Sequence, residues 1–415
     1  MSKKEKLSTE AYKGVRDFYP EDQAFLNYLI ATFRSTLERW GYVEYNASIL
    51  EPSELYKAKG SENEEVVREQ TYTFLDRGER EVTLRPEMTP TVARMVAGRR
   101  RELGFPLRWY SIPNCFRYER PQRGRLREFW QLNIDIFGSE SLAADTEIIA
   151  VSHAIMLALG ATQNDFTIKL GSRMYLDNLI QTLNFDEAQG KKLLILLDRR
   201  AKMPASDFER ELGGMGVALP MLSPKNPPQD VLAVLARLEA MGIENAVFDL
   251  GVVRGFDYYT GVVFEIFDTD PKNTRSIFGG GRYDNLLALF DDEKVPAVGA
   301  AAGDETLHNF LETRNLLPTY LPPTKVYIGL TSESLIAEAN KVAEALREGG
   351  VAVSVDFGEK KLSDQIKTAT KHKIPYLLVV GDDEIKSGSF TVRNLETGDE
   401  KKLSQGELSS FFLNL

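Results

Sequence analysis

Residues 131–135 carry polar side chains at every second position. Side chains alternate between the two faces of a strand, so Gln131, Asn133 and Asp135 lie on one face of a predicted strand, opposite an apolar row. The polar row spans about 13 Å, which is long enough to hold both ends of a small polar ligand. A water-facing sheet surface would have the same pattern, so the row by itself leaves both interpretations open.

A basic loop precedes this strand. Its arginines are Arg117, Arg120, Arg123, Arg125 and Arg127, and they bracket the tip of a predicted hairpin at residues 119–126. Guanidinium groups bind phosphate oxygens in pairs and stack on flat rings, so the loop suits a nucleotide. Arginines are also common on exposed hairpins, but here they adjoin the polar row. Together the two features favour an anion site beside a polar pocket.

A second polar segment, residues 252–265, places Arg254, Tyr258 and Tyr259 among apolar residues typical of a buried strand. Buried polar groups must pair with each other or with a ligand, because leaving them unpaired is costly. Further along, three glycines at residues 279–281 would let the backbone approach a ligand closely, although a tight turn explains them equally well. The chain has no Gly-x-x-x-x-Gly-Lys-Ser/Thr loop, so side chains on a sheet would have to hold any nucleotide.

Composition narrows the class of protein. The 415 residues include 61 acidic and 51 basic side chains, and the net charge of −10 argues against nonspecific coating of nucleic acid. Cys115 is the single cysteine, which excludes an internal disulfide framework, and with three scattered histidines it argues against a zinc site. No apolar run approaches the roughly 18 residues of a membrane span, and no signal peptide is visible, so we expect a cytoplasmic protein without membrane contact.

The elements that would position these residues form three parts. Strands mixed with non-alternating helices predict an α+β domain built on an antiparallel sheet. A helical insertion follows at residues 173–245, and a proline-rich linker at 315–323 precedes a small α/β domain at 324–415. In the first domain, the predicted elements are a helix at 21–40, a helix capped by Thr89 with Pro90 at its first position, and strands at 42–50, 71–75, 81–85, 107–112, 114–118 and 128–137. After the linker, they are a strand at 326–330, a helix at 333–348, a strand at 351–356, a helix at 362–372 and a strand at 376–380.

The motifs closely resemble those of histidyl-tRNA synthetase, a class II aminoacyl-tRNA synthetase. The resemblance covers nearly the whole chain and rests on residues 13–17 (KGVRD), 83–90 (TLRPEMTP), 116–125 (FRYERPQRGR) and 254–259 (RGFDYY). It implies a catalytic domain in two parts, 1–172 and 246–314, on a six-stranded antiparallel sheet flanked by helices. It also implies an insertion that embraces the tRNA acceptor arm, a C-terminal anticodon-binding domain and a homodimer.

The same resemblance implies roles for individual residues. Glu87, Thr89 and Gln131 would hold the α-amino end of histidine, with Met88 beside them. Asp135, Tyr258 and Tyr259 would read the imidazole. Arg117 would contact the carboxylate and the α-phosphate, Arg125 and Glu119 would help to bind ATP, and Arg254 would stabilise charge during catalysis. Mg²⁺ is expected with ATP, and no zinc is expected.

Two positions depart from the family pattern. Ser48 stands where the first class II motif has a proline, in the region that forms the dimer interface. Thr306 stands where the third motif has an arginine that binds ATP. Another cation would then have to contact the phosphates, and the sequence offers Arg275 as the first candidate and Arg314 as the second.

Two functions fit the resemblance. One is ATP-dependent attachment of L-histidine to tRNA(His) through a histidyl-adenylate. The alternative is a noncatalytic paralogue that binds histidine as a signal, like the regulatory subunit of ATP phosphoribosyltransferase. Loss of the third-motif arginine favours this alternative, whereas the intact segment at 254–259 and the C-terminal domain favour the enzyme.

Overall fold

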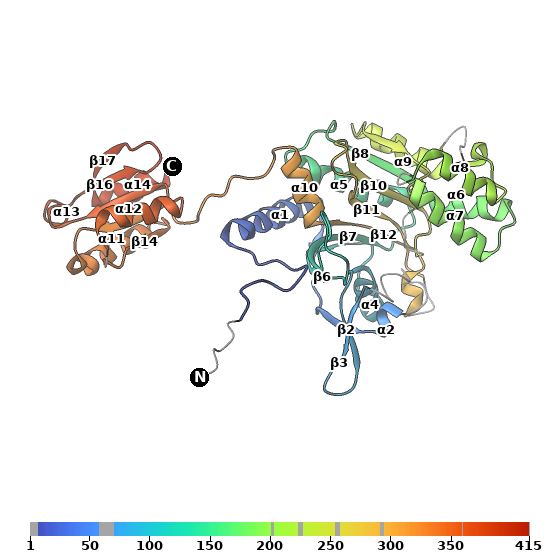
Figure 1. The fold of residues 1–415 in the computed structure, drawn as a ribbon, viewed down its shortest axis with the longest axis horizontal. Coiled ribbons are helices and arrows are strands. Elements are labelled where there is room, and N and C mark those ends of the chain that lie inside the picture. The colour runs from blue at the N-terminus through green and yellow to red at the C-terminus, as the bar shows by residue number, and fades with distance from the viewer. Residues whose placement is uncertain are drawn as a thin grey trace. The chain divides into compact units, whose positions relative to one another are not determined.

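The computed structural model describes residues 7–57, 70–200, 203–222, 227–253, 258–290, 294–358 and 360–414. The chain divides into two compact units, Met1–Pro318 and Thr319–Leu415 (Figure 1). The boundary between them falls within the proline-rich segment 315–323. No helix among the described residues is long and apolar enough to cross a membrane.

The first unit is built on a large sheet. In the order in which they pair, its strands are β1 (Val43–Glu44), β5 (Leu107–Ser111), β7 (Glu128–Phe137), β12 (Ala297–Gly303), β11 (Ser276–Arg282), β10 (Val262–Asp268), β8 (Phe166–Ser172) and β9 (Ala246–Phe248), and β6 (Asn114–Phe116) pairs with β7. Every pairing from β5 to β8 is antiparallel, which confirms the prediction. Only the outermost strands, β1 and β9, pair in parallel with their neighbours.

One face of this sheet carries the main hydrophobic core. The helices that cover it are α1 (Pro20–Arg39), α5 (Leu142–Ala158), α9 (Gln229–Ala240) and α10 (Asp304–Thr313). Leu132, Ile134 and Ile136 of β7 belong to this core, as the period-two pattern predicts. Helix α4 (Thr89–Arg99) packs on the opposite face, where Val92 and Val96 contact a second core (Figure 1). The polar row of β7 lies on this second face.

Two local predictions were wrong. The strand expected at 42–50 is two strands, β1 and β2 (Leu50–Pro52), which belong to different sheets. The chain turns between them because Asn46 Oδ1 accepts the Ala47 N–H (2.8 Å) and Ser48 Oγ accepts the Leu50 N–H (3.2 Å). Thr89 is not a cap but the first residue of α4, and Met88 is the N-cap without a side-chain hydrogen bond.

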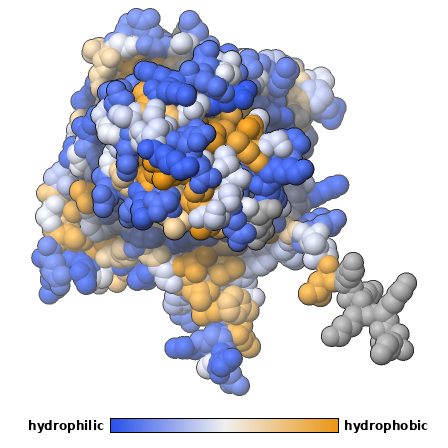
Figure 2. Space-filling view, turned by 90° about the vertical axis from the view of Figure 1, so that its left-hand side faces the viewer, coloured by the Kyte–Doolittle hydropathy of each residue, from blue (hydrophilic) through white to orange (hydrophobic). Residues whose placement is uncertain are grey.

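A small sheet forms an arm. Strands β2, β4 (Glu81–Leu84) and β3 (Tyr72–Leu75) pair antiparallel, and the short α2 (Glu54–Lys57) follows β2. Phe74 and Leu75 are 47% and 66% exposed. Figure 2 shows the arm projecting at the bottom of the view, with hydrophobic surface along its length and hydrophilic surface at its tip. The arm therefore presents apolar side chains that the described chain does not cover.

The helical region at 173–245 contains two packing groups. Helices α6 (Arg173–Thr182), α7 (Glu187–Arg199) and α8 (Ala205–Gly214) share a core of their own, which includes Leu193, Leu197 and Leu212. Helix α9 instead contributes Val231 and Val234 to the main core beneath the large sheet. The first three helices thus form a separate layer beside the sheet.

The second unit is a five-stranded sheet with helices. Its strands pair in the order β14 (Val353–Val355), β13 (Val326–Leu330), β15 (Tyr376–Val380), β16 (Ser389–Asn394) and β17 (Glu400–Ser404), and its helices are α11 (Ile336–Glu348), α12 (Leu362–Lys371), α13 (Asp382–Ser387) and α14 (Gln405–Leu413). The first three strands are parallel, which confirms the predicted parallel core. The sequence interpretation ended at β15 and missed the antiparallel β16 and β17.

Candidate active site

A cavity of about 1210 Å³ lies on the second face of the large sheet. The predicted site residues that line it are Glu87, Thr89, Arg117, Glu119, Arg125, Gln131, Asp135, Tyr258 and Tyr259. Met88 is fully buried and is not among the lining residues. Arg254 lies outside the described residues. The fold therefore brings together nine side chains from positions 87 to 259.

Strand β7 places the polar row along the cavity. Gln131, Asn133 and Asp135 all line it, while the residues between them face the main core. Neighbouring strands leave room because they carry glycine at the points of closest approach. A Cβ atom at Gly299 of β12 would lie only 2.2 Å from Asp135 Oδ1. The cavity thus depends on the small residues of β11 and β12 as well as on the polar row.

Asp135 is a buried carboxyl with one oxygen held and one oxygen unused. It is 4% exposed, and the Tyr283 hydroxyl donates to Oδ1 at 2.5 Å. Within the described chain, Oδ2 has no hydrogen-bond partner. Burial raises the pKa of the Asp135 carboxyl to about 7, and the hydrogen bond from Tyr283 opposes this shift. Such an oxygen is suited to accept a hydrogen bond from an N–H group of a ligand.

Tyrosine rings surround this carboxyl. Tyr258 and Tyr259 are both buried, with ring centroids 4.8 Å apart, and Tyr258 lies 5.9 Å from the Tyr283 ring. Sequence reasoning assigned no role to Tyr283, which follows the glycine run at 279–281 by two residues. Its signal was weak, because residue 283 reaches residue 135 only through the pairing of β11 with β12 and of β12 with β7. Burial and the nearby Asp135 raise the pKa of the Tyr283 hydroxyl, so it remains the proton donor.

The basic hairpin supplies two of its arginines to the cavity. Arg117 donates through Nε to the Pro86 carbonyl (2.9 Å), and its guanidinium carbon lies 5.4 Å from the centre of the Phe129 ring. Arg125 forms an ion pair with Glu119 (2.9 Å). Arg127 is used differently, since it stacks on the Tyr118 ring at 4.0 Å outside the cavity. The hairpin thus combines site residues with structural ones.

The start of α10 forms another wall. Arg16 forms ion pairs with Asp304 (2.5 Å) and Glu305, and the Trp130 N–H donates to Asp304 Oδ1 (3.0 Å). The next residue, Thr306, also lines the cavity. Of the two candidate substitutes for an arginine there, Arg275 lines the cavity and Arg314 does not. No group of three or more Asp, Glu, His or Cys side chains among the described residues could hold a metal ion.

Comparisons with known proteins agree on one family. The family model of histidyl-tRNA synthetase matches residues 14–307, and that of an anticodon binding domain matches residues 325–415. Histidine–tRNA ligase of Leptospira biflexa is 40% identical over 427 residues, covering 98% of this chain and 97% of the relative. Histidine–tRNA ligase of Pyrococcus furiosus is 33% identical over 433 residues, covering 98% and 99% of the two chains.

A solved structure shares the fold. The crystal structure of histidyl-tRNA synthetase from Nostoc sp. PCC 7120 superposes with a TM-score of 0.83 at 24% identity, covering 99% of this chain and all of the other. The family match extends over most of the sheet, its flanking helices and the cavity, and the relatives align over nearly the full length. This chain belongs to the histidyl-tRNA synthetase family.

Proposed function

We propose that this chain attaches L-histidine to tRNA(His), using ATP, and that the cavity on the large sheet is where it does so. The observation that carries the proposal is Asp135, a buried carboxyl that lies among three tyrosines and whose Oδ2 has no hydrogen-bond partner in the part of the chain that the structure describes. A site of this kind selects an imidazole, because a ligand without an N–H group would leave the buried oxygen unpaired. Arg117 and Arg125 supply positive charge along the same cavity.

The first step joins histidine to the nucleotide. A carboxylate oxygen of histidine attacks the α-phosphorus of ATP, the bond to the β-phosphate oxygen breaks, and pyrophosphate leaves. The attacking carboxylate is already ionised at neutral pH, so no strong base is needed. Positioning and electrostatic stabilisation provide the catalysis, and arginines are suited to both.

The proposed roles follow the chemistry of each side chain. Asp135, Tyr258 and Tyr259 bind the imidazole, and Glu87, Thr89 and Gln131 bind the α-ammonium group. Arg117 bridges the histidine carboxylate and the α-phosphate, and Arg125, oriented by Glu119, contacts the nucleotide. The predicted role of Arg254 in charge stabilisation stays a prediction, because this residue lies outside the described chain.

The second step transfers the histidyl group to a hydroxyl of the terminal ribose of the tRNA. An ester forms, the mixed anhydride breaks and AMP leaves. We assign binding of the anticodon to the second unit. We assign binding of the acceptor arm to helices α6–α8, because Leu197, Asp198 and Arg200 at the end of α7 line the cavity. Mg²⁺ is proposed as the cation that accompanies ATP, whose phosphates offer the oxygen ligands it prefers. A cytoplasmic location is likewise proposed.

We propose that the chain forms a homodimer through the arm. Phe74 and Leu75 are exposed there, and apolar residues gathered on one projecting element are typical of an interface. Ser48, where the family pattern has a proline, lies in the turn at the base of the arm. Arg85 Nη1 holds this turn by donating to the carbonyls of Ala47 (2.9 Å) and Ser48 (3.3 Å).

The decisive experiment is histidine-dependent exchange of labelled pyrophosphate into ATP, followed by charging of tRNA(His). An active enzyme exchanges label only when histidine is present. The alternative, a regulatory paralogue, would bind histidine and exchange none. This alternative is less well supported, because the relatives that align over the full length are named as ligases and the anticodon domain is retained.

A further inference from the structure

Position 306 cannot supply the positive charge that an ATP triphosphate requires. Thr306 is short and uncharged, and its hydroxyl donates to the Gly303 carbonyl (3.0 Å) at the start of its own helix. The two residues before it are acidic and are held by Arg16. This wall of the cavity therefore offers phosphates no cation of its own, and a neighbouring segment must provide one.

Arg275 reaches the same part of the cavity from another segment. It belongs to the loop at 269–275, immediately before β11, and lines the cavity together with Thr306. A Cβ atom at Gly124, on the tip of the basic hairpin, would lie 3.0 Å from Arg275 Cδ and 3.6 Å from Asn309 Nδ2. Asn309 follows Thr306 by three residues on α10, so both lie on one face of that helix. Arg275 and the helix that carries Thr306 thus both lie beside the hairpin tip.

The Arg275 guanidinium has no counter-ion within the described part of the chain. With the residues that the structure describes it forms no hydrogen bond or ion pair. Two other cations of the cavity form ion pairs: Arg125 with Glu119 (2.9 Å) and Lys169 with Asp249 (2.9 Å). Burial and the like charge of Arg125 lower the pKa of the Arg275 guanidinium, while Glu119 opposes the shift. Two guanidinium groups that repel each other across a cavity are stabilised by an anion between them.

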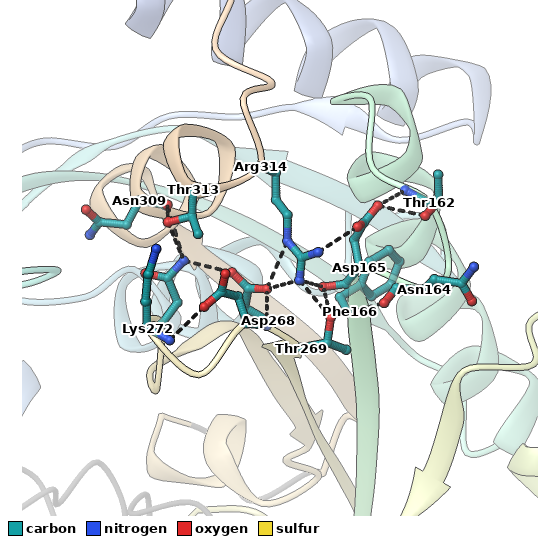
Figure 3. A network of polar contacts seen from close by, with 12 residues as sticks. Thr162, Asn164, Asp165, Phe166, Asp268, Thr269, Lys272, Asn309, Thr313 and Arg314 are labelled. Carbon is teal, nitrogen blue, oxygen red and sulfur yellow. Dashed lines mark hydrogen bonds and ion pairs between the residues drawn. The ribbon is translucent and has the colours of Figure 1, made fainter.

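Arg314 is unavailable for this role, although it is close in sequence to Thr306. Its guanidinium forms ion pairs with Asp165 (2.8 Å) and Asp268 (2.5 Å), and it also donates to Thr269 Oγ1 (2.7 Å) (Figure 3). Asn273 joins the same network by donating to Asp268 Oδ2 (2.7 Å). Arg314 therefore holds the start of the loop that carries Arg275, and its own charge is used within the protein.

The geometry points to Arg275 as the residue that binds the β- and γ-phosphates of ATP, in place of an arginine at position 306. This inference rests on the proposed function, since it names a contact within the same site. The guanidinium can donate two parallel hydrogen bonds to phosphate oxygens. The contact holds the leaving pyrophosphate and neutralises charge as the bond to the α-phosphate breaks.

The test compares Arg275→Ala with Lys272→Ala, which removes a positive charge from the same loop but whose exposed side chain lies outside the cavity. Pyrophosphate exchange should show kcat/KM for ATP reduced about ten- to a hundredfold in Arg275→Ala. The KM for histidine should stay at the parental value. In calorimetry, ATP binding should weaken while AMP binding does not change, because AMP lacks the two phosphates. Lys272→Ala should behave like the parent.

A rescue variant makes the test independent of folding effects. Thr306→Arg introduced into Arg275→Ala should restore much of the lost ATP use, since it returns a cation to the same part of the cavity. The inference is overturned if Arg275→Ala uses ATP as well as the parent, or if it loses AMP and ATP binding equally. A parent that exchanges no pyrophosphate refutes the proposed function instead, and the difference between ATP and AMP binding then still decides the role of Arg275.

Discussion

The carboxyl group of Asp135 is buried in the protein and is also proposed to bind a ligand. Its Oδ1 accepts a hydrogen bond from Tyr283, and its Oδ2 has no hydrogen-bond partner among the described residues. Since burial raises its pKa to about 7, the residue changes charge in the physiological range. The protein stabilises the ionised form with one hydrogen bond, and we propose that the imidazole of histidine supplies the second.

Asp135→Asn should raise the KM for histidine by roughly tenfold or more, because the amide keeps the size but loses the charge and one acceptor. The KM for ATP should change little. Folded Asp135 has a higher pKa than the unfolded residue, so it stabilises the protein at low pH and this contribution is lost as the pH rises through about 7. The melting temperature of Asp135→Asn relative to the parent should therefore increase with pH. An unchanged KM for histidine would contradict the assignment.

Tyr283→Phe should shift a pH profile in a defined direction. The hydroxyl lowers the pKa of Asp135 by bonding to its carboxylate, so its removal raises that pKa further. In the parent, the KM for histidine should fall as the pH rises through about 7, and in the variant the same fall should occur at higher pH. Tyr327→Phe removes a similar bond, to Asp356 (2.5 Å), in the second unit and serves as the control. Coincident profiles for Tyr283→Phe and the parent would refute this role.

Two strands of the large sheet, β11 and β12, shape the site mainly by carrying glycine, which has no side chain. Strand β12 pairs with β7, strand β11 pairs with β12, and both carry glycines where larger side chains would fill the cavity. At Gly280 a Cβ atom would lie 2.2 Å from the Gly299 carbonyl oxygen, so the two strands also pack too closely to accept a side chain there. The glycine run is therefore explained by close approach within the sheet rather than by a tight turn.

Gly299→Ala should impair histidine binding more than ATP binding. The added methyl would meet Asp135 Oδ1 at 2.2 Å and the Ile134 carbonyl at 2.8 Å, and the backbone contact cannot yield. We expect a higher KM for histidine and a lower melting temperature. Gly98→Ala, where the added Cβ meets nothing within 4 Å, provides the matched control. Parental histidine kinetics in Gly299→Ala would show that the carboxyl can move without loss.

At the scale of the whole molecule, the two units have separate cores. The large sheet and its helices form one set of clusters, and Val326, Leu378, Phe412 and their neighbours form another in the second unit. Each unit also has its own sheet. Such independence allows the two activities, adenylate formation and tRNA recognition, to be tested apart.

Ending the chain after Pro318 should leave histidine-dependent pyrophosphate exchange largely intact and weaken tRNA charging, because the cavity lies wholly within the first unit. Circular dichroism of the fragment should verify its folding. Loss of exchange in a folded fragment would show that the second unit contributes to the adenylation site.

Phe74→Glu should convert a dimer into a monomer, since a charge on the exposed face of the arm is costly to bury at an interface. Analytical ultracentrifugation measures the change. Phe357→Glu alters a 79% exposed aromatic residue of the second unit and should leave the oligomeric state unchanged. If Phe74→Glu sediments like the parent, the arm is not the interface.

The sequence alone determined those features that depend on local periodicity. The alternation in β7 predicted which of its residues face the core and which line the site, because a strand's side chains alternate regardless of its neighbours. The same reasoning predicted the helix α1, the basic hairpin and the parallel strands of the second unit. Motif resemblance then identified the family, which the comparisons confirmed.

Only the tertiary structure decided which polar groups are paired. Tyr283 meets Asp135 across 148 positions of sequence, and Arg314 meets Asp165 and Asp268 across 149 and 46. No local pattern encodes such contacts, so the sequence could rank Arg275 before Arg314 but could not show what either residue contacts. The fold distinguishes the two arginines. It buries Asp268 against Arg314, whereas Arg275 lies in the cavity without a counter-ion among the described residues. Of these two arginines, Arg275 is therefore the one whose charge is available to a ligand.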